Sequence, residues 1–595
     1  MPFLPNLSEG NQSRAVVDTF GGYNHNIKIG EGEWYDEQNL TSDYYPVFAN
    51  RKPMSTYKIV NGVQNIIAKD ALAWIADPAH MGAKLYYNDY EIDFGLGLRL
   101  NDEYPKQLVS MGAYLCIFPD GLYVNTADLT DRGSMEAYYD SNNFSVRFIP
   151  CDVNGNDYDN LYASASAPES ATNGEYWMDT SGSTHVLKQY SAPADMWVEI
   201  PNVYVKIVCN NIGANFSQYD GVIISHASHN LTDDGVLKEQ VEALNGTAVI
   251  QKVDTSYIVI PGILDEEAWQ LDGGMTVHRK VPKMDYVCES NNRLWGCRYG
   301  MTNGKTVNEI YACKLGDFKN WNCFQGISTD SYAVSVGTDG KFTGCIAYLG
   351  YPTFFKENYI HRISGNMPSN YQMATTACRG VQDGSWASLA IVNEILYYKS
   401  RTDVCAYDGS LPVGVSVQLG NELYHDAVAG AHGGKYYIGM RSSDGGRLFV
   451  YDTLRGLWHR IGNAVPYAFA SWGDELYYSY NNTIVAINGT VGRLYTAKEW
   501  YAESGMIGYE LVDHQYVSRY NIRMKLAEGA KCTLAIEYDS DGRWIEQGTI
   551  HGQGTDSFVI PVIPQRCDHF RIRLSGIGDI RIYSITKMIE QGSDA

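Results

Sequence analysis

The sequence lacks long hydrophobic runs and a secretory leader. No stretch reaches the roughly 18 apolar residues that suggest a membrane-spanning helix, so we expect no membrane partner. The first residues, MPFLPNLSEGNQSRAVV, contain no apolar core of the kind found in signal peptides. We therefore expect the protein to be made, and to assemble, in a cytoplasm.

Clusters of basic residues are also missing. No run of Lys and Arg exceeds two residues, the formal net charge is -22, and the isoelectric point is about 5.0. So acidic a surface repels nucleic acid, which excludes a role based on gripping DNA unless a local basic patch exists. DNA could still pass along such an acidic surface without binding to it. The alternative is that the charge serves solubility alone.

Sequence motifs of known catalytic or metal-binding sites are scarce. The twelve cysteines form no CxxC pair, so neither a disulfide framework nor a zinc signature is expected. HExxH, GxSxG, a P-loop and a GxGxxG that opens a helix are all absent from the sequence. These absences predict that the protein is not an enzyme, with no catalytic residue, no cofactor and no metal.

What the chain has in excess is tyrosine and glycine, with 46 Tyr and 58 Gly against 19 Pro among 595 residues. Tyrosine favours half-buried strand surfaces, and glycine supplies tight turns. The composition therefore predicts an all-β protein, and its length predicts several domains.

Short Tyr-rich strand pairs recur along the chain. Their anchors are Ala73, Leu115, Leu294, Cys345, Leu396, Tyr437 and Tyr477. Within each of the two groups the steps are 42 residues, and then 51, 51, 41 and 40 residues. Periods of about 40 to 50 residues are typical of β-propeller blades. The pattern predicts a β-propeller of about seven blades, with six or eight left open.

The period also divides the chain into domains. We predict an N-terminal arm at 1–55, the first part of the propeller at 56–126, an inserted mostly-β domain at 127–283, the second part of the propeller at 284–493, and a C-terminal β-sandwich at 494–595. The arm is irregular in sequence. It either closes the propeller ring or threads onto a neighbour.

The inserted segment predicts three local features. GEYWMDTSGSTHVLKQYSAPADMWVEIP reads as a small β-meander anchored in the core by Trp177 and Trp197. DDGVLKEQVEAL predicts a helix capped by Asp233 or Asp234, with an apolar face of Val236, Leu237, Val241 and Leu244. NGTAVIQKVDTSYIVIPG predicts a hairpin that turns near residues 254–256.

Two features indicate the form of the remaining parts. In the C-terminal segment, Tyr516, Ser518, Tyr520, Ile522 and Met524 share one face at period 2, and Asp541-Gly542 predicts a hairpin turn. In the propeller, the segment from Gly433 to Trp458 is similar to a kelch blade.

Two constellations raise the question of a site. Asp152, Asn154, Asn156, Asp157 and Asp159 could offer oxygens to Ca²⁺, but the Gly and Glu of an EF-hand loop are missing, and a solvated turn is the better interpretation.

The second constellation is Cys567, Asp568 and His569. Strand alternation would let Cys567 meet His569 but would keep Asp568 apart, which favours a structural cluster with Arg566.

Several segments resemble β-propeller virion proteins of tailed bacteriophages, of the packaged-DNA stabilisation or tail-hub type. The opening GEWYDEQNLTSDYYPVFANRKP is similar to their N-terminal arm. VEALNGTAVIQKVDTSYIVIPG and the "Y-W-D-T … L-K … W" pattern resemble phage tail and fibre modules. SGMIGYELVDHQYVSRYNIRMKL and PQRCDHFRIRLSGIGDIRIYSI resemble a module that closes structural proteins in phages of Firmicutes.

The resemblance implies a virion structural protein, a hub or adaptor at the portal–tail (neck) end that helps to seal packaged DNA and attach tail components. Its partners would be portal, adaptor and tail proteins and further copies of itself in a ring, with packaged DNA in passing. The main alternative is a surface decoration or receptor-binding protein that binds host glycans. A polysaccharide-degrading propeller enzyme is the third possibility.

Overall fold

The computed structural model describes residues 12–591 except 78–81, 96–97, 101–105, 159–160, 233–234, 272, 303, 495–498, 509–514, 564 and 566. Strands dominate the described residues, which confirms the expected all-β class. Helical structure within them is confined to α1 (Val236–Glu242) and to short 3-10 turns, η2 (Ile212–Asn215), η3 (Pro368–Asn370), η4 (Trp386–Ser388) and η5 (Val417–Leu419).

Among the described residues, seven small antiparallel sheets form the middle of the molecule. In chain order their strands are β6 (Val63–Ala68), β7 (Leu72–Ala76), β8 (Lys84–Tyr87) and β9 (Tyr90–Ile92); β10 (Gln107–Met111), β11 (Tyr114–Phe118), β12 (Leu122–Asn125) and β13 (Arg132–Ser134); β27 (Tyr286–Ser290), β28 (Arg293–Thr302), β29 (Lys305–Ala312) and β30 (Tyr332–Ser335); β31 (Phe342–Tyr348), β32 (Tyr351–Lys356), β33 (Tyr359–Ser364) and β34 (Gln372–Ala377); β35 (Ala390–Val392), β36 (Ile395–Lys399), β37 (Val404–Tyr407) and β38 (Val413–Gly414); β39 (His425–His432), β40 (Lys435–Ser442), β41 (Gly445–Asp452) and β42 (Leu457–Gly462); and β43 (Ala468–Trp472), β44 (Glu475–Tyr480) and β45 (Thr483–Ala486) with β5 (Ser55–Ile59) and β46 (Arg493–Leu494).

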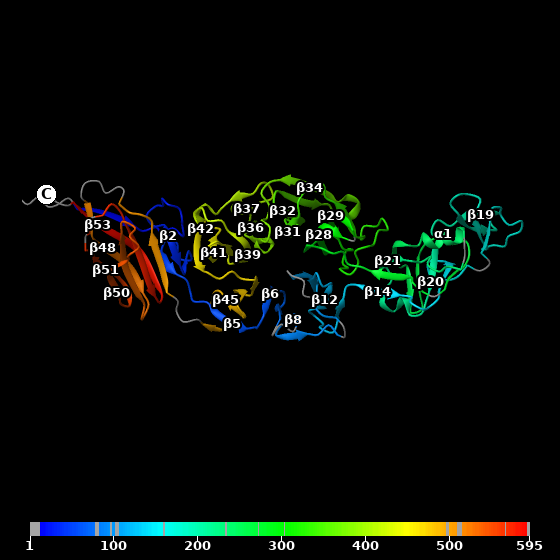
Figure 1. The fold of residues 1–595 in the computed structure, drawn as a ribbon, viewed down its shortest axis with the longest axis horizontal. Coiled ribbons are helices and arrows are strands. Elements are labelled where there is room, and N and C mark those ends of the chain that lie inside the picture. The colour runs from blue at the N-terminus through cyan, green and yellow to red at the C-terminus, as the bar shows by residue number, and fades with distance from the viewer. Residues whose placement is uncertain are drawn as a thin grey trace, which may run out of the picture.

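These sheets follow one another around a ring, an arrangement of the β-propeller type (Figure 1). The first strand of one sheet packs beside the first strand of the next, as β39 does with β43 and β43 with β6. The ring is closed by β5, which comes from the N-terminal part of the chain and pairs antiparallel with β45. Closure of this kind leaves no gap between the first and last sheets.

Of the seven residues that mark the repeat in the sequence, six lie in the second strand of a sheet. Leu396 in β36 and Tyr437 in β40 are examples, and both are buried. Cys345 is the exception, because it lies in the first strand, β31, opposite Phe354 of β32. In the kelch-like segment, the spacing of the two aromatic residues places Tyr451 directly opposite the buried Trp458 across β41 and β42.

Two larger sheets share one hydrophobic core at one end of the molecule. The first has the order β3 (Leu40–Thr41), β4 (Phe48–Asn50), β53 (Ile580–Gln591), β48 (Gln515–Leu526) and β51 (Gly554–Pro561), with β1 (Gln12–Val17) also on β53. The second has the order β2 (Trp34–Gln38), β47 (Trp500–Ser504), β52 (Phe570–Ile577), β49 (Lys531–Tyr538) and β50 (Ile545–His551). We call this unit the end module. Tyr520, Ile522 and Met524 of β48 are buried in its core, as the period-2 pattern predicts. Before Tyr520 the prediction is wrong, because a register shift between Val517 and Arg519 places Val517 in the core and not Tyr516 or Ser518.

The expectation that residues 1–55 form an irregular arm is wrong for their described part. Strands β1 to β4 pair with β53 and β47, and Phe20, Trp34 and Phe48 are buried in the core of the end module. The sequence pattern misses this because the partners of these short strands lie several hundred residues away. The N-terminal segment is therefore a structural part of the end module.

The same N-terminal segment fixes the end module to the ring. His459 Nδ1 of β42 lies 2.7 Å from Glu37 Oε1 of β2, and both side chains are buried. Burial raises the pKa of Glu37, while His459 acts in the opposite direction. The amide of Tyr23 donates to the Trp458 carbonyl at 2.7 Å, and Gly22 lies so close that a Cβ would approach that oxygen to 2.1 Å.

The inserted domain leaves the ring between β13 and β27. It contains the sheet β14 (Ala137–Asp140), β26 (Thr276–Arg279), β21 (Gly221–Ser225) and β22 (Gly246–Val249); the sheet β23 (Lys252–Asp254), β24 (Tyr257–Pro261), β20 (Tyr204–Val208), β15 (Val146–Cys151) and β25 (Ala268–Gln270); and the meander β16 (Tyr162–Ser164), β17 (Tyr176–Asp179), β18 (Val186–Ser191) and β19 (Met196–Glu199). The expected hairpin at 254–256 is β23–β24, with Asp254 opposite Tyr257.

Two details of the inserted domain differ from the sequence prediction. Helix α1 buries Leu237 and Val241, but Val236 is exposed because it stands in the first turn on the outer side. The proposed caps, residues 233 and 234, lie outside the described residues. Trp177 is a buried anchor of the meander, whereas Trp197 on β19 is only half-buried and packs edge-on against Trp177.

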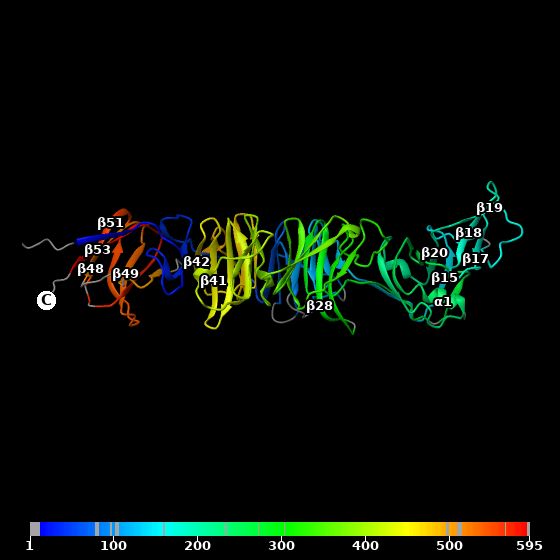
Figure 2. The same ribbon diagram turned by 90° about the horizontal axis from the view of Figure 1, so that it is seen from above.

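The three parts lie in a row. The end module and the inserted domain stand at opposite edges of the ring (Figure 1). Seen from above, the molecule is an elongated body with the ring edge-on at its centre (Figure 2). Each outer part is thus positioned by its junction with one side of the ring.

Replacing Trp34 by Ala tests whether the N-terminal strands are integral to the end module. Removing this buried ring should cost about 3–5 kcal/mol, because a cavity is left in the shared core. Thermal and denaturant unfolding would measure the loss. Ile27→Ala, at a position 82% exposed, is the control and should change stability little; equal effects of the two variants would contradict the assignment.

Acid should loosen the junction between the N-terminal segment and the ring. Burial favours the neutral form of Asp452, but the Ser42 hydroxyl and the Arg455 guanidinium outweigh it and hold the pKa of Asp452 below its usual 3.8. The stabilisation is complete above that value and is lost as the pH falls through the lower folded pKa.

Calorimetric unfolding between pH 7 and pH 3 would detect this loss, which should appear below about pH 4. Asp452→Asn should lower the free energy of unfolding at neutral pH and should make its decrease below about pH 4 shallower. An equally steep decrease in this variant would show that other groups cause the effect.

Candidate functional site

A buried polar network joins the inserted domain to the ring. Arg279 Nη1 lies 2.5 Å from Asp220 Oδ2, and Asn320 Nδ2 donates to Asp220 Oδ1 at 2.9 Å. Asn320 Oδ1 in turn accepts the Gly221 amide at 2.8 Å. All three side chains are buried, so each charge has its partner and the contact between the two parts is specific.

Gly221 is needed where this contact is tightest. A Cβ at this position would lie 2.7 Å from the Asn322 carbonyl oxygen and 2.7 Å from Cys323 Sγ. The absence of a side chain lets the start of β21 lie directly against the loop 313–331, which connects β29 and β30 of the ring.

The loop 313–331 is itself fixed from inside. Asp330 Oδ2 accepts the amides of Gln325, Gly326 and Ile327 at 2.6, 2.7 and 3.1 Å. The buried Arg293 donates to the carbonyl oxygens of Cys313 and Asp330 at 2.7 and 2.5 Å. The loop therefore presents its outer residues on a rigid base.

A groove of about 520 Å³ opens between this loop and the inserted domain. Its walls are formed by residues 201–204, 247–251, 261–263 and 322–325. Amide and aromatic side chains are prominent among them, namely Asn202, Tyr204, Gln251, Asn322, Phe324 and Gln325. The volume lies in the range of small-ligand sites.

None of the described residues that line the groove carries a charged side chain, although the protein as a whole has a net charge of -22. Asn322 Nδ2 donates to the Lys280 carbonyl at 3.0 Å, and Gln251 Nε2 donates to the Val249 carbonyl at 3.1 Å. The side chains of Asn202 and Gln325 make no hydrogen bond to any described residue and are exposed. The groove therefore offers neutral donors and acceptors to a ligand.

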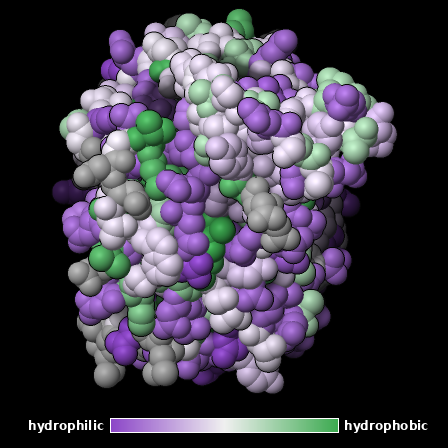
Figure 3. Space-filling model, turned by 90° about the vertical axis from the view of Figure 1, so that its right-hand side faces the viewer, coloured by the Kyte–Doolittle hydropathy of each residue, from purple (hydrophilic) through white to green (hydrophobic). Residues whose placement is uncertain are grey.

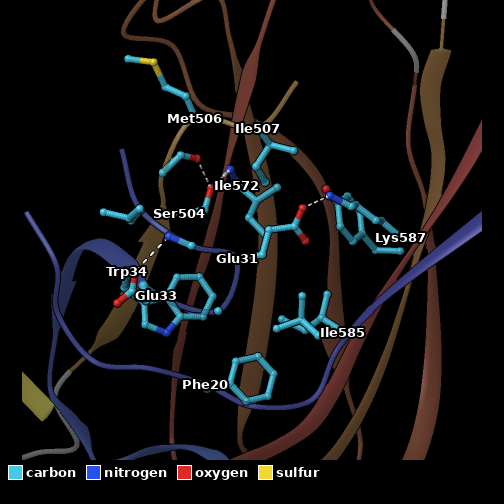
Figure 4. Close-up of a pocket in the computed structure, with 16 residues that line it drawn as sticks. Phe20, Glu31, Glu33, Trp34, Ser504, Met506, Ile507, Ile572, Ile585 and Lys587 are labelled. Carbon is cyan, nitrogen blue, oxygen red and sulfur yellow. Dashed lines mark hydrogen bonds and ion pairs between the residues drawn. The ribbon is translucent and has the colours of Figure 1, made fainter. Parts of the chain in front are cut away.

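A second cavity lies inside the end module, between the N-terminal segment and β47, β52 and β53 (Figure 4). It is lined by Phe20, Trp34 and Ile572 among others, and an ion pair between Glu31 and Lys587 lies at its side. Its volume of about 50 Å³ has room for little more than a water molecule. This cavity is a packing defect of the shared core rather than a ligand site.

The oxygen-rich turn after β15 uses its carboxylates internally. Asp152 Oδ1 accepts the amides of Asn154 and Asn156 at 2.9 and 2.8 Å, and Asp157 pairs with Lys206. Asp159 lies outside the described residues. The bonds of Asp152 are those of a turn closed by its own side chain.

The residues before β52 differ from the sequence prediction. His569 Nδ1 lies 3.1 Å from Asp568 Oδ2, and His569 Nε2 lies 2.8 Å from Ser540 Oγ. The prediction that Asp568 could not join His569 is wrong, because the strand begins only at Phe570 and alternation does not apply before it. Arg566 lies outside the described residues.

The resulting Ser540–His569–Asp568 row has the order of a catalytic triad but not its surroundings. The amides after the serine already donate, Asp541 to the Tyr538 carbonyl, Gly542 to Glu537 Oε1 and Arg543 to Asp541 Oδ1. They are therefore not free to stabilise an oxyanion. Sequence inspection could not find this row, because Ser540 belongs to a distant hairpin turn.

Two kinds of feature are absent from the described residues. These residues contain no group of three or more His, Cys, Asp or Glu placed to hold a metal ion. No helix among them combines the length and the apolar character that crossing a membrane requires.

Comparison with known proteins identifies no family. No family model matches the chain, and no curated protein matches it. Among solved structures, an exo-beta-1,3-galactanase from Phanerochaete chrysosporium is 9% identical with a TM-score of 0.22, covering 50% of this chain and 95% of that one. A mutant Trypanosoma rangeli sialidase with trans-sialidase activity is 9% identical with a TM-score of 0.20, covering 97% and 95%. The acylaminoacyl peptidase of Pyrococcus horikoshii is 10% identical with a TM-score of 0.21, covering 54% and 55%.

These neighbours correct one sequence prediction. The prediction that the chain is not an enzyme is contradicted, since the similar structures are glycoside hydrolases and a sialidase, and we withdraw it. Their identities and TM-scores are too low to transfer an activity or a residue role to this chain.

Replacing Arg279 by Met tests the buried network at the junction between the inserted domain and the ring. The variant leaves the Asp220 carboxylate buried without its cation, which should cost about 3–5 kcal/mol and loosen the junction. Denaturant unfolding and protease cleavage in the loop 313–331 would measure both effects. Lys252→Met, at an exposed position on β23, should leave both unchanged; wild-type behaviour of Arg279→Met would contradict the role of the pair.

Proposed function

We propose that this protein is a structural component of a tailed-bacteriophage particle, a hub or adaptor at the portal–tail end. In this proposal the ring is a propeller of seven blades closed by β5, and the end module is a β-sandwich completed by the N-terminal strands. The other domain divisions follow those predicted from the sequence. The protein would be assembled into the virion in the host cytoplasm and would help to seal packaged DNA and attach tail components.

The observation that carries the proposal is the fixed, in-line arrangement of the three parts (Figures 1 and 2). Both outer parts are tied to opposite edges of the ring by buried polar contacts. On one side Glu37 pairs with His459, and on the other Asn320 of the ring loop hydrogen-bonds to Asp220 and to the Gly221 amide. A body built in this way holds two partners at a set distance and transmits load between them, as an adaptor must.

Sequence and charge support the same function. The N-terminal, inserted and C-terminal segments each resemble parts of phage virion proteins. A net charge of -22 would let packaged DNA pass along the protein without adhering. Portal, adaptor and tail proteins are the proposed partners, together with further copies of the chain around the particle axis, where many weak interfaces add up.

A second function, surface decoration or receptor binding, is favoured by the outer end of the inserted domain. Tyr162 of β16 and Met196 and Val198 of β19 are exposed there, beside the half-buried Trp197. Viewed from that end, the apolar side chains form short strips separated by hydrophilic ones (Figure 3). Small mixed patches of this kind suit contact with a polar partner such as a host glycan.

Location in the particle tests the proposed function. Virions carrying a labelled copy of the chain would be imaged by cryo-electron microscopy, and we expect ring-shaped density at the portal–tail vertex. Density on the head surface or at the distal tail tip would replace this function with decoration or receptor binding. Absence of the label from purified virions would refute both.

A further inference from the structure

We propose that the groove between the inserted domain and the loop 313–331 binds a neutral saccharide. The proposal rests on the groove's own geometry. It gives the receptor-binding alternative a site and a ligand class, and it would also hold for a protein at the neck of the particle.

The charge of the lining selects the class of ligand. On so acidic a chain, a groove without Asp, Glu, Lys, Arg or His in its walls is unusual. An anionic or cationic ligand buried there would find no counter-ion and would lose its hydration without compensation. A neutral ligand carries no such penalty.

The polar groups of the lining match hydroxyl groups. A primary amide offers two N–H donors and a carbonyl acceptor, and a sugar hydroxyl both donates and accepts. Asn202 and Gln325 have both sides of the amide available, and they stand on opposite walls, one on the inserted domain and one on the ring loop. A ligand between them could be held from both sides.

The aromatic rings and the size of the groove fit the same ligand. Tyr204 and Phe324 line it, and Phe324 keeps 52% of its surface exposed although its loop is held rigidly by Asp330. An exposed ring on a fixed base is suited to cover an apolar face of a sugar. About 520 Å³ accommodates a short oligosaccharide.

An extended peptide fits less well. It would add to the short free edge of β22, but one carbonyl of this edge is already used, and the chain that follows β22 is bonded within the domain. The Val249 carbonyl accepts from Gln251 Nε2, and the amides of Ile250 and Gln251 donate to Asp220 and Val259. Pro201 and Pro261 in the walls offer no amide at all.

A glycan array of neutral and anionic oligosaccharides, probed with the purified full-length chain, tests the proposal. We expect retention on neutral glycans, with titration calorimetry on the best of them to give the dissociation constant. Phe324→Ala and Gln325→Ala should each weaken binding by about tenfold, a change that calorimetry resolves.

Ile327→Ala is the matched control, because Ile327 is 50% exposed on the same loop but does not line the groove. It should bind as the wild type does. Retention of no neutral glycan, retention of anionic glycans alone, or equal affinity of Phe324→Ala and Ile327→Ala would each overturn the proposal. Since the assay uses isolated protein, these outcomes are independent of where the chain lies in a particle.

Discussion

The architecture depends on the N-terminal segment pairing with strands far along the chain. Strand β5 completes the seventh sheet of the ring by pairing with β45, and β1 to β4 complete the two sheets of the end module. One short segment thus closes the ring and joins it to its neighbour. Without these non-local ladders the ring would have an open edge, and the core around Trp34 and Trp500 would lose a wall.

The buried charges at the two junctions fix the placement of the outer parts on the ring more than they add to the stability of the protein. A buried ion pair gains little net free energy, but a buried polar group left without its partner is costly. The Glu37–His459 pair, and the hydrogen bonds of Asn320 to Asp220 and Gly221, therefore penalise arrangements other than the observed one. Close backbone approaches at Gly22 and Gly221 act in the same sense. The junctions therefore hold the outer parts at a set position on the ring, and the groove with its ligand groups exists only because one junction is rigid.

The sequence predicts those parts of the fold that repeat or alternate locally. Six of seven anchors lie on second strands, and the buried face of β48 follows period 2 from Tyr520 to Met524. The pairing of β1 to β4 with the end module could not be predicted from the sequence, because strands that pair across some 500 residues leave no local pattern. The groove was missed for the same reason, since Asn202, Gln251 and Gln325 belong to three separated segments. Asp568 and His569 were misplaced because the strand starts only at Phe570, so alternation does not apply to either of them.

The central claim is that ring, end module and inserted domain form one rigid, elongated body. Small-angle X-ray scattering from the purified chain tests it most directly. We expect a profile that a single extended body reproduces, unchanged between low and high salt, because both junctions are buried. A profile that requires an ensemble of orientations for either outer part would contradict the account.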